Sequence, residues 1–144
     1  MIYTALTKKA LRLCFESHKD QTDKSGLPYV FHPFHLAEQM DDEISTCVAL
    51  LHDVVEDTDV TFEDLAAEGY PEEVLAALRL LTHHPEEPYF DYVKRIKSNP
   101  IATKVKLADL AHNSDLTRMD EITPYALTRN EKYKKAAAIL RRED

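Results

Sequence analysis

Glycine is nearly absent from this sequence, which has only Gly26 and Gly69 among its 144 residues and contains no tryptophan. Antiparallel sheets use glycine in many of their tight turns, so its scarcity disfavours a sheet-rich protein and favours an all-α fold. The length suits one domain, residues 1–144, with a core of its own. We therefore expect a compact, single-domain helical protein without internal repeats or low-complexity linkers.

Cysteine and long apolar stretches are scarce as well. Cys14 and Cys47 form no CxxC pair, which argues against a disulfide framework or a zinc knuckle and favours small buried thiols in a reducing compartment. The N-terminus lacks the apolar run and cleavage site of a signal peptide, and no segment is long enough to span a bilayer. These features predict a cytoplasmic protein with no membrane partner.

Basic residues are outnumbered, since 18 Lys and Arg face 26 Asp and Glu and the formal net charge is -8 at pH 7. A nucleic-acid polymer normally requires a basic face, so this charge argues against such a partner. It does not exclude a small anionic substrate, because a local basic cluster or a bound metal ion can overcome the field of the whole molecule. The oligomeric state is left open by the sequence.

Apolar residues recur at helical spacing along most of the chain. The pattern predicts helices over about residues 4–17, 33–40, 41–57, 61–68, 71–81, 88–98, 100–113 and 124–142. Thr61 has the character of an N-cap and Gly69 that of a helix stop, and proline suits the first turn at Pro33 and Pro100. A long polar loop, residues 18–31, separates the first two helices.

The stretch from Ala49 to Thr58 combines a core helix with ionisable residues. At 3.6 residues per turn, His52, Asp53 and Glu56 lie on one stripe of a helix that is otherwise apolar nearly all round. A buried carboxylate loses several kcal/mol of solvation unless a partner compensates. A bound metal ion would suit adjacent His and Asp, and a salt-bridged polar cluster is the alternative.

Two further places combine ionisable groups with apolar surroundings. Asp109 is followed one turn later by His112 and Asn113 on the same helix face, and His32 lies within an apolar segment. Two histidine nitrogens and two carboxylate oxygens would suit a divalent ion such as manganese, iron or zinc. They would also leave coordination positions open for water, as a catalytic site requires. The spacing does not show whether the three places converge.

These segments resemble the HD superfamily of metal-dependent phosphohydrolases. The resemblance is nearest to the hydrolase domain of the stringent-response (p)ppGpp synthetase/hydrolases and to their small single-domain relatives. It lies in KSGLPYVFHP at 24–33, ALLHDVVEDT at 49–58 and KLADLAHN at 106–113, which match in order, spacing and local sequence. The resemblance implies a compact, all-α HD-domain fold.

The resemblance also implies a site, a cofactor and an activity. It places one divalent metal, typically manganese, on His32, His52, Asp53 and Asp109, and it makes Glu56 and Asp57 the acidic pair that activates or orients water. It makes Lys24, Ser25 and Asn113 contacts of the substrate. The implied function is a metal-dependent phosphohydrolase that cleaves a small nucleotide or pyrophosphorylated metabolite, like a (p)ppGpp 3′-pyrophosphohydrolase. The alternative is a metal- and nucleotide-binding sensor of the same fold that hydrolyses poorly.

The sequence departs from the (p)ppGpp hydrolases at two positions, where Asp23 and Asp115 stand in place of the usual arginines. Arginine pairs with phosphate and stacks on bases, whereas aspartate does neither. The substrate is therefore not identified by the sequence. Arg118, one helical turn beyond Asp115, could supply the missing cation or could pair with Asp115.

The remaining histidines carry weaker expectations. His112 could form a hydrogen bond to a metal ligand without contacting the metal itself, because it shares a helix face with Asp109. His35 is expected to be packed or at the surface. His83 and His84 are expected to lie in a solvated turn, with the rim of a pocket as the alternative.

Overall fold

The structure of this chain is a computed structural model that describes residues 1–142. Its helices are α1 (Ala5–His18), α2 (Phe31–Glu38), α3 (Glu43–Leu51), α4 (Val54–Asp57), α5 (Phe62–Ala67), α6 (Glu72–Leu81), α7 (Tyr89–Ile96), α8 (Pro100–Asn113), the 3₁₀ helix η1 (Leu116–Arg118) and α9 (Pro124–Arg141). Within residues 1–142, β pairing is confined to one bridge between Thr22 and Pro28. The all-α prediction is confirmed.

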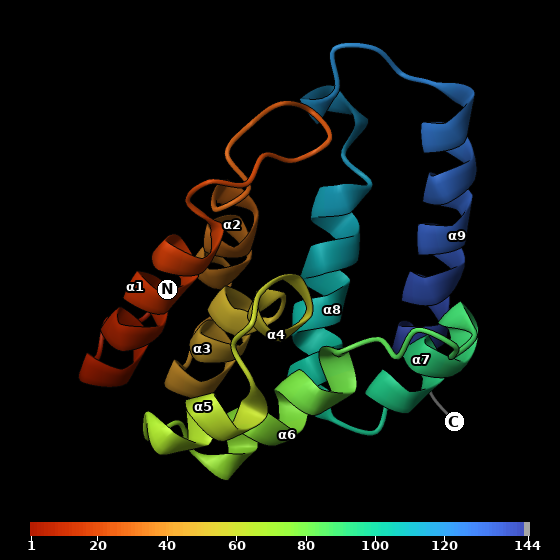
Figure 1. Ribbon diagram of the computed structural model, residues 1–144. Coiled ribbons are helices and arrows are strands. Elements are labelled where there is room, and N and C mark those ends of the chain that lie inside the picture. Colours follow the sequence, from red (N-terminus) through yellow and green to blue (C-terminus); the bar gives the residue numbers. More distant parts are fainter. Residues whose placement is uncertain (143–144) are drawn as a thin grey trace.

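Helix α3 packs against α1, α2, α6 and α8 (Figure 1). Every residue from Ser45 to Leu51 is buried, as expected of a helix that is apolar nearly all round. Helix α8 packs against α2, α3, α6 and α7, and α9 covers α7 and α8. Residues near the ends of α3 and on α8 are therefore enclosed by several other helices.

Most helix boundaries follow local capping chemistry. Thr4 and Thr61 each form a capping box with the third residue of α1 and α5, so the predicted N-cap at Thr61 is confirmed. Asn99 caps α8, which begins with Pro100 in its first turn. Gly69 follows α5 with a φ of 93°, a conformation that glycine adopts without strain, and it ends the helix as predicted.

The continuous helix predicted over residues 41–57 is wrong. The chain leaves α3 after Leu51, turns through His52 and Asp53, and starts again as the short helix α4. Asp53 has φ and ψ of -108° and 0°, outside the helical region. The turn re-aims both polar side chains toward partners on other elements, so tertiary contacts override the local helical pattern there.

Cys14 and Cys47 are free and fully buried, as predicted, and burial raises the pKa of each thiol to about 12. Among the helices of residues 1–142, none combines the length and the apolarity needed to cross a membrane.

Candidate metal centre and active site

Three of the predicted metal ligands converge at the centre of the molecule. His32 comes from α2, His52 from the turn after α3, and Asp109 from α8. Asp109 Oδ1 lies 2.8 Å from His32 Nε2 and 3.6 Å from His52 Nε2. One ligand-type atom from each of the three buried residues lies within 4.8 Å of the other two.

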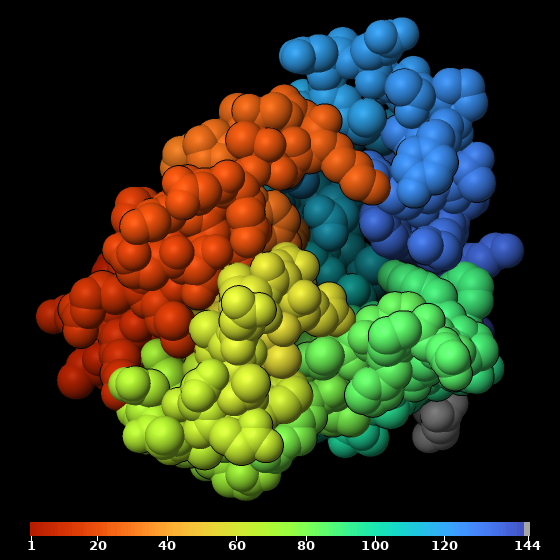
Figure 2. Space-filling model, viewed as in Figure 1, coloured from red at the N-terminus to blue at the C-terminus, as the bar shows by residue number. Residues whose placement is uncertain are grey.

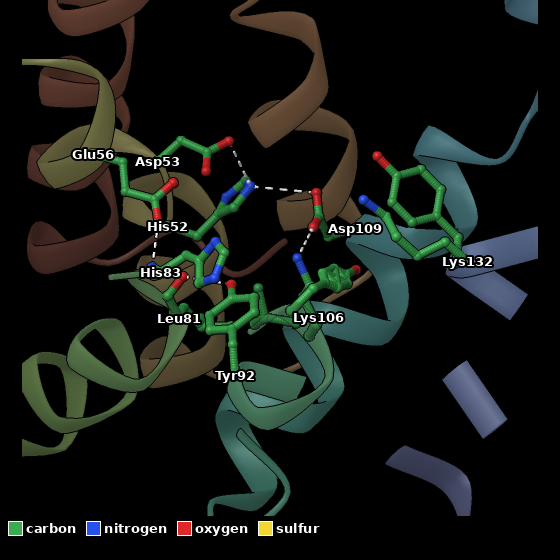
Figure 3. Close-up of a pocket in the computed structure, with 12 residues that line it drawn as sticks. His52, Asp53, Glu56, Leu81, His83, Tyr92, Lys106, Asp109 and Lys132 are labelled. Carbon is green, nitrogen blue, oxygen red and sulfur yellow. Dashed lines mark hydrogen bonds and ion pairs between the residues drawn. The ribbon is translucent and has the colours of Figure 1, made fainter. Parts of the chain in front are cut away.

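His52 is oriented as a metal ligand would be. Its Nδ1 lies 2.7 Å from the carbonyl oxygen of Ala49, which can only accept, so Nδ1 carries a proton and Nε2 is the nitrogen left to face a metal. Burial opposes a positive charge on His52, but Asp53 and Asp109 outweigh it and raise the pKa of the ring. Nε2 is buried without a hydrogen-bond partner, although carboxylate oxygens of Asp53 and Asp109 lie 3.0 and 3.6 Å away. Figure 3 shows these two carboxyl groups on either side of that nitrogen. A cation among Nε2 and the two carboxylate groups would compensate their negative charge, and a divalent metal ion suits these donor atoms.

The fourth predicted ligand, Asp53, lies outside the three-residue group. Its Oδ2 is 3.0 Å from His52 Nε2 and also accepts a hydrogen bond from the Tyr29 hydroxyl. Burial alone would raise the pKa of Asp53, but His52 outweighs it and lowers the pKa to about 2. Asp53 is therefore an ionised carboxylate beside the group, and Tyr29 is a contact to which the sequence assigned no definite role.

Lys106 controls how Asp109 presents its two oxygens. Lys106 Nζ lies 2.9 Å from Asp109 Oδ2, while Asn113 Nδ2 donates to Oδ1 at 3.0 Å. Burial opposes ionisation of Asp109, but Lys106 and the two histidines hold its pKa well below the usual value. Oδ1 is thus left facing the histidines. Lys106 lies three residues before Asp109 on the same helix, and this spacing is the sequence feature from which the contact between the two side chains could have been predicted.

A cavity of about 270 Å³ opens beside the three-residue group, lined in part by His52, Asp53 and Asp109. Glu56 also lines it and accepts a hydrogen bond from the backbone N–H of His83, so the turn after α6 holds this carboxylate in place. His83 lines the cavity too, so the structure bears out the pocket-rim alternative for this histidine.

The other predicted acid, Asp57, does not line this cavity. Its pKa is raised to about 6 by burial and by the negative charges of Asp53 and Glu56. The structure thus brings Glu56, and not Asp57, to the cavity wall.

The opposite wall of the cavity carries cations and aromatic rings, chiefly Lys106, Lys132, Tyr89 and Tyr133. Lys132 Nζ lies 4.5 Å from the centroid of the Tyr89 ring. Lys106 is paired with Asp109, whereas no ion pair of Lys132 is found in residues 1–142. Lys132 belongs to α9, whose sequence carries no recognisable motif, so sequence analysis missed it.

A second cavity, of about 340 Å³, gathers the three predicted substrate contacts Lys24, Ser25 and Asn113. Tyr133 lines both cavities. Figure 2 shows the hollow that contains both cavities. Its borders are the helices α4, α7 and α9 together with the loop that precedes α2, and α8 forms its floor.

Asp23 and Arg118 form an ion pair at the edge of the second cavity, with 2.9 Å between Oδ2 and Nη2. Asp23 Oδ1 accepts hydrogen bonds from the backbone N–H of Ser25 and Leu27, so Asp23 closes the loop and its charge is neutralised. The alternative pairing of Arg118 with Asp115 is wrong, because Asp115 instead accepts from Thr117 N at 3.0 Å and caps η1.

His112 contacts His32, with 2.7 Å between the two Nδ1 atoms, and it does not line the first cavity. Burial, Arg118 and His32 lower the pKa of His112 to about 4. The ring of His35 lies 4.2 Å from that of His112, centroid to centroid, whereas His84 is exposed. The expectation that His112 contacts a predicted ligand therefore holds in the structure.

Fold and site together define an all-α domain with a buried His–His–Asp group, suited to a divalent metal, beneath a hollow that has one acidic and one basic wall.

No family model matches the chain. Over an alignment of 142 residues it is 30% identical to the guanosine-3′,5′-bis(diphosphate) 3′-pyrophosphohydrolase of Aquifex aeolicus. The alignment covers 90% of this chain and 19% of that protein.

Shorter stretches match other proteins of this kind. Identity is 50% over 56 residues to the enzyme of the same name from Vibrio cholerae and 40% over 62 residues to the bifunctional (p)ppGpp synthase/hydrolase SpoT of Escherichia coli. The chain spans less than a fifth of the length of these curated relatives, between 8% and 19%. The resemblance predicted from the three sequence segments is confirmed.

Proposed function

We propose that this chain is a metal-dependent phosphohydrolase domain that cleaves a small nucleotide or pyrophosphorylated metabolite, with (p)ppGpp 3′-pyrophosphohydrolysis as the reference reaction. The observation that carries the proposal is the convergence of His32, His52 and Asp109, with Nε2 of His52 buried and without a hydrogen-bond partner. The similarity to named (p)ppGpp pyrophosphohydrolases supports the choice of reaction.

The proposed ligands are His32, His52 and Asp109, with Asp53 as the fourth. Two imidazoles and two carboxylates suit manganese, and iron or zinc would also fit this donor set. When bound, the metal polarises a phosphate oxygen and makes water more acidic. Lys106 holds Asp109 Oδ2 at 2.9 Å and so reserves Oδ1 for the metal side.

The proposed general base is Glu56. Its carboxylate lines the same cavity as the metal ligands and is held by the N–H of His83, so it can take a proton from water without first reorienting. Asp57, next to it on α4, is proposed to support Glu56 by raising the local negative charge.

The substrate is proposed to lie across both cavities. Its reacting phosphates would face Lys132 in the first cavity, and the rest of the molecule would reach Lys24, Ser25 and Asn113 in the second. Because Arg118 is neutralised by Asp23, the second cavity offers less positive charge than two free arginines would. A nucleotide other than (p)ppGpp therefore fits the proposal as well.

The test combines metal analysis of the purified protein with turnover assays in added manganese, across (p)ppGpp, other nucleotides and small pyrophosphate esters. The proposal expects a stoichiometric metal ion and release of phosphate or pyrophosphate from at least one of these compounds. A stoichiometric metal without turnover would favour the sensor alternative, and a metal-free, inactive protein would exclude both.

Lys132→Met tests the substrate side separately from the metal. Loss of this cation should raise KM about 10- to 150-fold while metal content stays unchanged, because a charged contact to phosphate is worth about 1.5–3 kcal/mol. Steady-state kinetics on the best substrate measures this, with Lys134→Met on the same helix as the control. An unchanged KM would show that Lys132 does not bind the substrate.

A further inference from the structure

The contact between His32 and His112 has an informative geometry. The two Nδ1 atoms are 2.7 Å apart, and the ring planes lie within 8° of each other. Two parallel rings stacked face to face cannot come that close, so the rings lie edge to edge, with ring centroids 5.0 Å apart. This is the direction in which an imidazole N–H and an imidazole lone pair point.

Such a bond requires the proton on one nitrogen and a lone pair on the other. The other nitrogen of His32, Nε2, lies 2.8 Å from Asp109 Oδ1, within the three-residue group. A neutral imidazole that offers Nε2 to a metal must carry its proton on Nδ1. His112 Nδ1 must then be the acceptor.

We infer that His112 is a positioning residue that accepts the Nδ1–H of His32 and thereby fixes the tautomer and ring orientation in which His32 binds a metal. The inference rests on the metal centre proposed above. His52 is held in the same manner by a different acceptor, the carbonyl oxygen of Ala49, 2.7 Å from its Nδ1. Both histidines of the group therefore have the second nitrogen occupied.

His112 is itself held from two sides. Arg118 Nη1 donates to the carbonyl oxygen of His112 at 2.8 Å, which anchors the end of α8. The ring of His35 lies against that of His112 at a centroid distance of 4.2 Å and an angle of 29°. These two contacts hold the end of α8 and one face of the His112 ring, and so direct its Nδ1 toward His32.

The test compares His112→Leu, which removes the acceptor, with His112→Asn, whose Oδ1 can accept in nearly the same place. Zinc serves as a diamagnetic probe, and its dissociation constant is measured by calorimetry on metal-stripped protein. We expect His112→Leu to weaken zinc binding about 10- to 100-fold, and His112→Asn to restore most of the affinity. Substitution of the exposed histidine, His84→Leu, is the control and should change nothing.

A second measurement needs no variant. In zinc-loaded, nitrogen-15-labelled wild-type protein, NMR should detect a coupling between the two Nδ1 atoms, with the proton assigned to His32. A proton on His112 Nδ1, or wild-type zinc affinity in folded His112→Leu, would overturn the positioning role and leave the metal centre standing. Failure of the wild-type protein to bind zinc would overturn the metal centre and this inference with it.

Discussion

At the residue scale, the centre of the molecule depends on charges that are compensated by specific neighbours. Lys106 is largely buried, with 13% of its side chain exposed, and its Nζ lies 2.9 Å from Asp109 and 5.2 Å from the centroid of the Tyr92 ring. Desolvation opposes the charge on Lys106, but Asp109 outweighs it and raises the lysine pKa. Removing only one member of this pair leaves the other charge buried without compensation.

Asp109→Asn should therefore both abolish metal binding and destabilise the metal-free protein by about 3–5 kcal/mol. The double variant Asp109→Asn/Lys106→Met should recover most of that stability, because the uncompensated cation is gone, while metal binding stays lost. Urea unfolding with a chelator present and metal analysis measure the two effects. If the single variant is as stable as the wild-type protein, the pair does not have the buried character assigned to it.

Glu56→Gln tests the proposed general base. The amide keeps the size of the side chain but cannot take a proton, so kcat should fall by about 10²- to 10⁴-fold while metal content is unchanged. Glu63→Gln, at an exposed position of α5, is the control and should retain full activity. Wild-type turnover in Glu56→Gln would place the base elsewhere, with Asp57 as the next candidate.

At the scale of elements, the loop before α2 is tied to η1 by Asp23 and Arg118. Both side chains are largely enclosed, with 11% and 19% of their surface exposed, so the pair is weakly screened by solvent. Burial alone would raise the pKa of Asp23, but backbone N–H groups of Leu27 and Ser25, together with Arg118, lower it. The aspartate that replaces an expected arginine thus has a structural role.

Asp23→Asn should lower the free energy of unfolding at pH 7 by about 1.5–3 kcal/mol, since a charged hydrogen bond is lost. Because the pKa of Asp23 is lower in the folded than in the unfolded state, its contribution is complete above the unfolded value of about 4 and is lost as the pH falls through the folded value. The difference between variant and wild type should therefore shrink below about pH 4.

Denaturant unfolding at several pH values measures this dependence, and Asp20→Asn in the same loop is the control, expected to stay within about 0.5 kcal/mol. A difference that is constant from pH 7 to pH 3 would contradict the assigned pKa shift.

Some helix boundaries can be predicted from the local sequence alone. The boundaries of α5 and α8 follow from Thr61, Gly69, Asn99 and Pro100, whose effects are confined to neighbouring residues. The interruption between α3 and α4 does not follow from local pattern, since the apolar periodicity continues through it. It depends on partners of His52 and Asp53 that lie on other elements.

At the scale of the whole molecule, the proposed metal would connect α2, the turn after α3 and α8, which are distant in sequence. A ligand that binds only the folded state stabilises it by mass action. Manganese at about 100 times its dissociation constant should add about 2.7 kcal/mol and raise Tm by about 5–10 °C.

Thermal unfolding with manganese, and again after chelation, measures this stabilisation. Asp109→Asn provides the control, because it should show no shift at the same manganese concentration. Equal shifts in the two proteins would mean that manganese acts at another place.

The sequence by itself determined the helical class, most helix boundaries and the list of candidate residues, because periodicity, capping and short motifs act over a few neighbouring positions. Only the tertiary structure decided that His32, His52 and Asp109 form one group with Asp53 beside it. It alone showed that Arg118 pairs with Asp23 and that Lys132 reaches the cavity. These contacts join residues far apart in the chain, and their geometry depends on how the helices pack around α3 and α8.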